Sequence, residues 1–171
     1  RNQSAFYFGL TAFGKEFYGL KNYVHARLEN LSDGQQQILA YLAIAYHYAQ
    51  YEVPEQAFGF VIGVTVGTPI KLEKVLENAQ DTLDLLICSK ARTWRPLHEL
   101  IAEEILYQAL TSPNSDPRNW WQQLSFWAKR FIEFCRNGEG IVSSSLLELV
   151  KRTFVYRDSH LEVLGTEQTG E

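Results

Sequence analysis

Hydrophobic side chains recur every three or four residues through most of the chain, which predicts a mainly α-helical protein. Residues 6–17 carry such a stripe, and a second helix is expected over residues 18–30. Their inward positions are Phe6, Leu10, Phe13, Phe17, Leu20, Val24 and Leu28. The two segments would form the end of a helical domain that precedes residue 31.

The third helix has the clearest start signal. Ser32 and Gln35 form a capping-box pattern, in which each side chain satisfies a free backbone N–H of the first turn. An apolar face follows at Ile38, Leu39, Leu42, Ala43, Tyr46 and Ala49. Proline is tolerated at the first position of a helix, so we expect Pro54 to open a short helix that ends near Val61.

The pattern changes in the middle of the chain. A helix is expected over residues 69–80, followed by a short strand over 83–89, a turn at 90–92 and a returning strand at 93–95. Pro96 then begins a helix that runs to about Leu110. Three helices followed by a β-hairpin and another helix are the order of a winged-helix domain. We place this domain, with the hairpin as its small wing, at residues 31–110.

A second helical unit is expected after a loop at residues 111–117, which are rich in Ser, Pro, Asn and Asp. A long helix follows, residues 137–140 end it, and a final helix comes after residue 145. The apolar positions in helical register are Trp120, Leu124, Trp127, Phe131, Phe134, Leu146, Leu149, Val150 and Phe154. Residues 111–157 would therefore form a helical arm, and residues 158–171 a polar tail or linker.

Composition narrows the function. The formal net charge is −4, which disfavours a nucleic-acid partner because phosphate binding usually needs a basic excess. Cys88 and Cys135 both lie in apolar runs, where cysteine behaves as a small buried hydrophobe. No apolar stretch is long enough to span a bilayer, and no signal peptide opens the chain, so we expect a cytoplasmic protein. The absence of any methionine suggests a piece of a larger protein.

No complete catalytic centre is evident, and we expect no enzyme activity from this chain alone. A phosphate-binding Gly-x-x-x-x-Gly-Lys loop, a Gly-x-Ser-x-Gly elbow and a Cys-x-x-Cys pair are all missing. His98 and Glu99 begin like a zinc-protease helix, but Ala102 stands where the second histidine must be. We therefore expect no metal site. Glu99, Glu103 and Glu104 are expected on a solvent-facing helix surface.

His98 is the candidate binding residue with the most informative context. It lies at the start of a helix, directly after the expected wing, with Arg95 beside it. Free N–H groups and positive potential at a helix start suit an anion such as a phosphate. The alternative is a partly buried histidine that bonds only to local backbone. Both interpretations remain open from the residues.

A nucleic-acid interpretation would use the helix at residues 69–80 and the wing. Lys71 and Lys74 lie on that helix, together with Glu73 and Glu77. The wing adds two more basic residues, Lys90 and Arg92. This patch is small and mixed in sign, and salt would screen it. A surface for protein contacts is the preferred interpretation.

Residues 31–50, 85–87 and Trp94 to Ala102 resemble the winged-helix region of STAND-type P-loop ATPases, the signal-transduction ATPases of immune receptors and bacterial defence proteins. Residues 4–13 resemble the end of the helical domain that precedes it. The run is also similar to vertebrate sterile-alpha-motif antiviral proteins and their bacterial relatives.

The resemblance implies a regulatory, non-catalytic module. A winged-helix histidine, here His98, would contact the β-phosphate of ADP and hold a closed state, with Arg95 as a neighbouring contact. The cofactors of the parent protein would be ADP and ATP. Its partners would be an upstream P-loop ATPase domain and a downstream sensor or repeat domain of the same chain, with oligomer formation on activation. Two alternatives remain: a winged-helix DNA-binding transcriptional regulator and a plain helical interaction scaffold.

Overall fold

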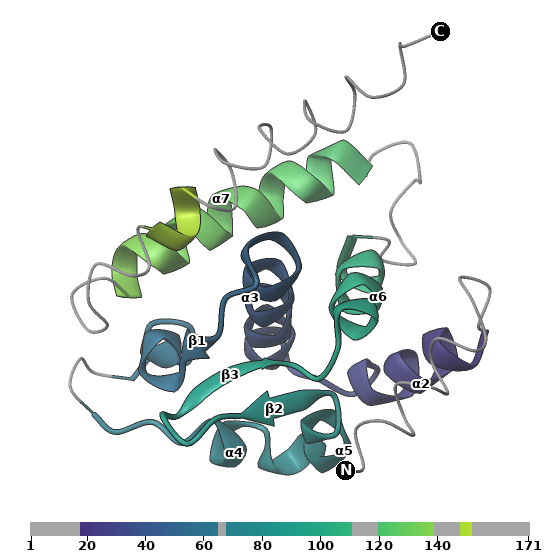
Figure 1. Cartoon of the computed structure of the whole chain (residues 1–171), viewed down its shortest axis with the longest axis horizontal. Coiled ribbons are helices and arrows are strands. Elements are labelled where there is room, and N and C mark those ends of the chain that lie inside the picture. The colour runs from purple at the N-terminus through teal and green to yellow at the C-terminus, as the bar shows by residue number, and fades with distance from the viewer. Residues whose placement is uncertain (1–17, 65–67, 111–119, 139–147, 152–171) are drawn as a thin grey trace, which may run out of the picture.

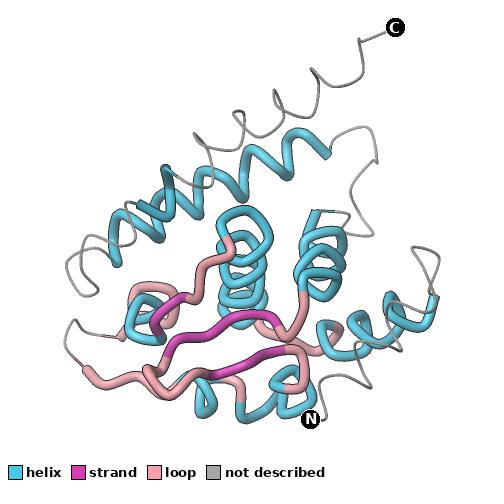
Figure 2. Tube along the Cα trace, viewed as in Figure 1, coloured by secondary structure: helices cyan, strands magenta, loops and turns pink. Residues whose placement is uncertain are grey.

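The computed structural model describes residues 18–64, 68–110, 120–138 and 148–151. The described chain is mainly helical, with one small antiparallel sheet flanked by helices (Figures 1 and 2). Its elements in chain order are α2 (Tyr18–Leu28), α3 (Asp33–Ala49), β1 (Val53–Pro54), the 3-10 helix η1 (Glu55–Gly59), α4 (Leu72–Val75), the 3-10 helix η2 (Glu77–Ala79), α5 (Gln80–Leu83), β2 (Leu86–Cys88), β3 (Thr93–Pro96), α6 (Glu99–Leu110) and α7 (Trp120–Gly138). Residues 1–17, with the stripe from Phe6 to Phe17, lie outside the described part, as do the expected loop at 111–117, most of the last helix and the tail.

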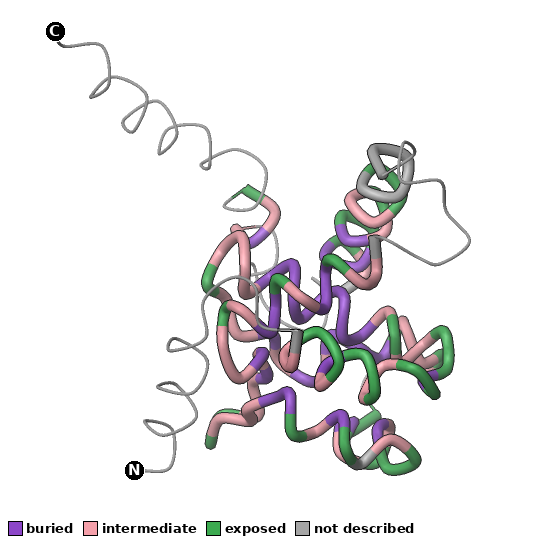
Figure 3. Tube along the Cα trace, turned by 90° about the vertical axis from the view of Figure 1, so that its right-hand side faces the viewer, coloured by how far each residue is buried: buried purple, intermediate pink, exposed green. Residues whose placement is uncertain are grey.

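α3 is the central helix, and it begins as its sequence predicts. The Ser32 hydroxyl accepts the Gln35 N–H at 3.4 Å, while the Gln35 side chain accepts the Ser32 N–H at 3.0 Å. All positions from Ile38 to Ala45 are buried, so α3 lies within the body of the protein. The exposed residues lie on the outer elements (Figure 3). The capping box is confirmed.

The sheet has three strands in the order β1–β3–β2, all antiparallel. The predicted turn and returning strand are confirmed, with Cys88 opposite Trp94 and Ile87 opposite Arg95. The third strand was not predicted. The short helix expected from Pro54 is confirmed in part: it is the 3-10 helix Glu55–Gly59, it ends before Val61, and Pro54 itself lies in β1 opposite Thr93. An edge strand tolerates proline, which donates no ladder hydrogen bond.

The continuous helix predicted over residues 69–80 is wrong. α4 ends at Val75, and Leu76 has φ −98° and ψ 9°, outside the α-helical region. The Gln35 side chain donates to the Val75 carbonyl at 2.8 Å, and the Ala79 N–H bonds Leu76 instead. A side chain from α3 therefore takes an acceptor that a continuous helix would use, and the segment breaks into α4, η2 and α5.

α6 starts at Glu99, three residues later than predicted, because Pro96 is still paired with Leu86 in the sheet. α7 lies across one side of the body, with the sheet and α4 on the other (Figure 1). Phe131, Phe134 and Cys135 are buried and belong to the same core as Val24 of α2 and the buried face of α3. The described parts of the expected preceding domain, winged helix and arm thus share one hydrophobic core. In the described residues, none of the helices combines the length and apolarity needed to cross a membrane.

Candidate functional site

His98 lies immediately before α6 and caps it. Its Nδ1 accepts the Leu100 N–H at 3.1 Å, and its carbonyl accepts the N–H groups of Ile101 and Ala102. Because Nδ1 accepts a hydrogen bond, the neutral imidazole carries its proton on Nε2. The ring is half-buried. The local backbone bond of the second interpretation is thus present.

Arg95 projects from β3 beside the last turn of α3. Its Nε donates to Glu52 at 3.1 Å, and Nη1 donates to the Tyr46 hydroxyl at 3.3 Å and the Pro96 carbonyl at 3.1 Å. The guanidinium carbon lies 5.1 Å from the centre of the Tyr46 ring. Arg95 is therefore held in a fixed place by internal contacts. An anion at this position would have to compete with Glu52.

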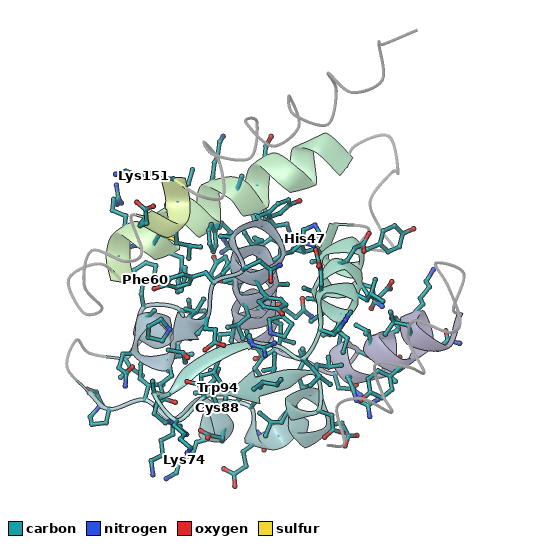
Figure 4. All side chains as sticks on the ribbon, in the orientation of Figure 1. His47, Phe60, Lys74, Cys88, Trp94 and Lys151 are labelled. Atoms are coloured by element: carbon teal, nitrogen blue, oxygen red, sulfur yellow. The ribbon has the colours of Figure 1, made fainter. Side chains whose placement is uncertain are left out.

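The end of α3 and the start of α6 meet at His47 and Glu99. His47 Nδ1 lies 3.9 Å from Glu99 Oε1, and His47 faces α6 (Figure 4). The Glu99 side chain is 56% exposed, and Glu103 is exposed one turn later. Glu104 is half-buried and accepts the Gln108 amide at 2.8 Å. Glu99 and Glu103 are exposed as predicted, whereas Glu104 faces solvent only in part.

Arg92, in the turn between β2 and β3, binds two carboxylates at once. Its Nε and Nη2 donate to the two oxygens of Glu55 at 2.8 and 2.6 Å, and its Nη1 and Nη2 donate to those of Glu73 at 2.6 Å each. Glu55 is 3% exposed and also accepts bonds from Leu72 N–H and Trp94 Nε1–H, both at 3.4 Å. Bidentate pairs between arginine and a carboxylate are stronger than hydrogen bonds between neutral groups.

The charges of Arg92 and its two carboxylate partners shift each other's ionisation. Hydrogen bonds from the Arg92 guanidinium lower the pKa of Glu73, and hydrogen bonds to Glu73 and Glu55 raise the pKa of Arg92. Arg92 also has a φ of 58°, in the left-handed region. Sequence reasoning placed Arg92 in the turn but missed Glu55 and Glu73 as its partners. Their spacing in the sequence carries no local signal.

Of the four basic residues in the nucleic-acid interpretation, three are exposed to solvent and one is engaged in ion pairs. Lys71, Lys74 and Lys90 are exposed, and Lys74 extends away from the body (Figure 4). Arg92, in contrast, is bound by two carboxylates. Glu77 is exposed beyond α4. The patch therefore presents three lysines beside acidic groups.

Two cavities lie away from these residues. A groove of about 760 Å³ runs between α2, α3, α6 and α7, with Leu39, Ile105 and Trp127 among its lining residues. A second cavity of about 270 Å³ lies between α2 and α5. Neither is lined by His98 or Arg95. Across the described residues, the His, Cys, Asp and Glu side chains form no group of three or more with a metal-binding arrangement.

Comparison with known proteins finds no matching family model, no similar curated protein and no similar solved structure. The resemblance to STAND-type ATPases therefore rests on the quoted residues alone.

Proposed function

We propose that the chain is a non-catalytic, winged-helix regulatory module of a STAND-type ATPase, which couples nucleotide state to a downstream sensor. The observation that carries the proposal is the geometry of His98. It stands directly between the sheet and α6, and the Leu100 N–H fixes its ring by donating to Nδ1. The positive potential at the start of α6 suits an anion such as a phosphate.

The order of the elements supports a winged helix. α3 is followed by β1, by the short helices η1 to α5, and then by the β2–β3 hairpin. β1 pairs with β3, so the hairpin is joined to the strand that follows α3. The wing turn is fixed by Arg92 rather than presented to solvent as a free basic loop. This favours a structural wing over one that reads DNA.

The mechanism is a two-state switch. A nucleotide shifts an equilibrium only by its difference in affinity for the two states. A contact from His98 to a phosphate of ADP in the closed state alone would supply that difference, about 1–3 kcal/mol or about 5- to 150-fold. Arg95 would strengthen the contact if the phosphate displaced Glu52. Release of the contact would free the helical arm.

The test measures ADP in the purified full-length protein by chromatography after denaturation. His98→Asn is the informative variant, because asparagine keeps an acceptor for the Leu100 N–H as a helix cap but is too short to reach the same phosphate. We expect it to lose bound ADP while keeping the wild-type circular dichroism spectrum, which shows that the variant still folds. His25→Ala, at an exposed position of α2, is the matched control and should retain ADP.

Retention of ADP by His98→Asn, or absence of nucleotide from the wild-type protein, would refute the role of His98. A plain interaction scaffold would then be the better proposal, since it predicts that His98 substitutions change stability alone.

Nucleic-acid binding remains the second candidate, because Lys71, Lys74 and Lys90 are exposed near the wing. Its test is fluorescence anisotropy with duplex DNA at increasing salt, comparing wild type with the triple lysine-to-glutamine variant. Binding that falls steeply with salt and is lost in the variant would support it. We expect no such binding at physiological salt.

A further inference from the structure

The 3-10 helix η1 stands between the wing and α7, and it contacts both. At its first residue, Glu55 holds the wing: its carboxylate binds Arg92, and its N–H donates to the Arg92 carbonyl at 3.1 Å. The same carboxylate accepts the Leu72 N–H at the start of α4. One buried side chain thus joins η1 to the wing and to α4.

The other end of η1 holds α7. Phe58, three residues after Glu55, is fully buried and stacks on Phe134 of α7, with ring centres 5.3 Å apart and planes inclined by 24°. Phe134 also stacks on Tyr41 of α3 at 4.7 Å. The wing and α7 therefore meet the same five-residue element at its two ends.

Such a short element has little freedom to adjust one end without the other. Ala57 and Phe58 are fully buried and Gly59 is buried. A Cβ added at Gly59 would lie 3.1 Å from the Ile70 side chain, so the packing beside Phe58 is tight. Packed cores of this density transmit a displacement rather than absorb it.

We propose that η1 couples the wing to α7, so that loosening the Glu55–Arg92 pair weakens the docking of α7, and undocking of α7 loosens the wing. This coupling goes beyond the proposed nucleotide switch. It needs neither nucleotide nor His98, so either proposal can fail without the other.

The experiment is native-state hydrogen exchange on the purified chain, read by mass spectrometry or NMR. Glu55→Gln keeps the size of the side chain but removes the charge that holds Arg92. We expect protection factors of α7 amides around Phe134 to fall about three- to tenfold, a coupling of the size seen between residues of one network. Amides in the middle of α3 should change by less than about twofold. Arg92→Lys, which leaves η1 unaltered, should have the same effect and serves if Glu55→Gln does not fold.

Glu73→Gln is the matched control, because it removes a charge from the same guanidinium but from α4 rather than η1. It should leave α7 protection unchanged. Coupling is reciprocal, so Phe134→Leu should speed exchange of the wing amides Arg92 and Thr93. Phe126→Leu, on the exposed side of α7, should not. Equal loss of protection in α7 and α3, or equal effects of Glu55→Gln and Glu73→Gln, would overturn the proposal.

Discussion

Phe134 tests whether α7 is an integral part of the fold. The side chain is 1% exposed and packs against Tyr41, Phe58 and Phe131, with ring centres 4.7, 5.3 and 6.0 Å away. It therefore joins α7 to α3 and to η1 at once. Replacing it with alanine would leave a cavity that three rings of a close-packed core cannot easily fill.

The size of the effect follows from the buried area. An aromatic side chain buries about 150–250 Å², and at about 25 cal/mol per Å² this corresponds to about 4–6 kcal/mol as an upper bound. Phenylalanine-to-alanine changes in cores cost about 3–5 kcal/mol. We therefore expect Phe134→Ala to lower the free energy of unfolding by about 4 kcal/mol. This is a large part of the total free energy of unfolding of a typical domain, which is about 5–15 kcal/mol.

Urea unfolding, followed by circular dichroism, measures this change. With a slope of about 2 kcal/mol per molar, the midpoint should fall by about 2 M. Phe126→Ala is the control within the same helix: Phe126 is 47% exposed and contacts Trp127 and Arg130. Its loss should cost less than about 1 kcal/mol, as surface changes usually do. If the two variants lose equal stability, or Phe134→Ala loses less than Phe126→Ala, then α7 does not dock as described.

Three further predictions follow from single contacts. Hydrogen bonds from Arg92 lower the pKa of Glu73 from its usual 4.5, so the pair stabilises the fold above pH 4.5 and this stabilisation is lost as the pH falls through the lower folded pKa. Between pH 7 and pH 3.5, Glu73→Gln should therefore lose less free energy of unfolding than wild type, and equal losses would contradict the prediction. Ser32→Ala removes the acceptor for the Gln35 N–H and should cost about 1 kcal/mol, seen as a lower thermal midpoint; an unchanged midpoint would show that the cap contributes nothing. Burial raises the pKa of the Cys135 thiol to about 12, so it should react with a thiol reagent at pH 8 far more slowly in the native than in the urea-unfolded chain, and equal rates would show that the site is open.

Several features of the fold could be predicted because their causes are local. The Ser32–Gln35 box acts within three residues, and its two hydrogen bonds form as expected. The turn at residues 90–92 and the strand after it also follow from local preferences. Phe131 and Phe134 of α7 are buried at the positions their helical register indicates.

The candidate site was predicted in part. The sequence drew attention to His98 and Arg95, and the structure gives each its internal partners: the Leu100 N–H for His98, and Glu52 and Tyr46 for Arg95. These partners lie on other elements or depend on where α6 begins. Their identity could not be obtained from spacing along the chain.

What the sequence determined by itself was therefore the location of α2, α3, α6 and α7, the capped start of α3 and the turn between β2 and β3, because those signals repeat or act over a few residues. Only the tertiary structure decided the rest. β1 has two residues and exists through pairing with Thr93 and Trp94. The helix over residues 69–80 breaks where Gln35, 40 residues away, takes the Val75 carbonyl. Burial of Glu55 depends on a guanidinium 37 residues later, because a buried carboxylate requires a charged partner that only folding can bring to it.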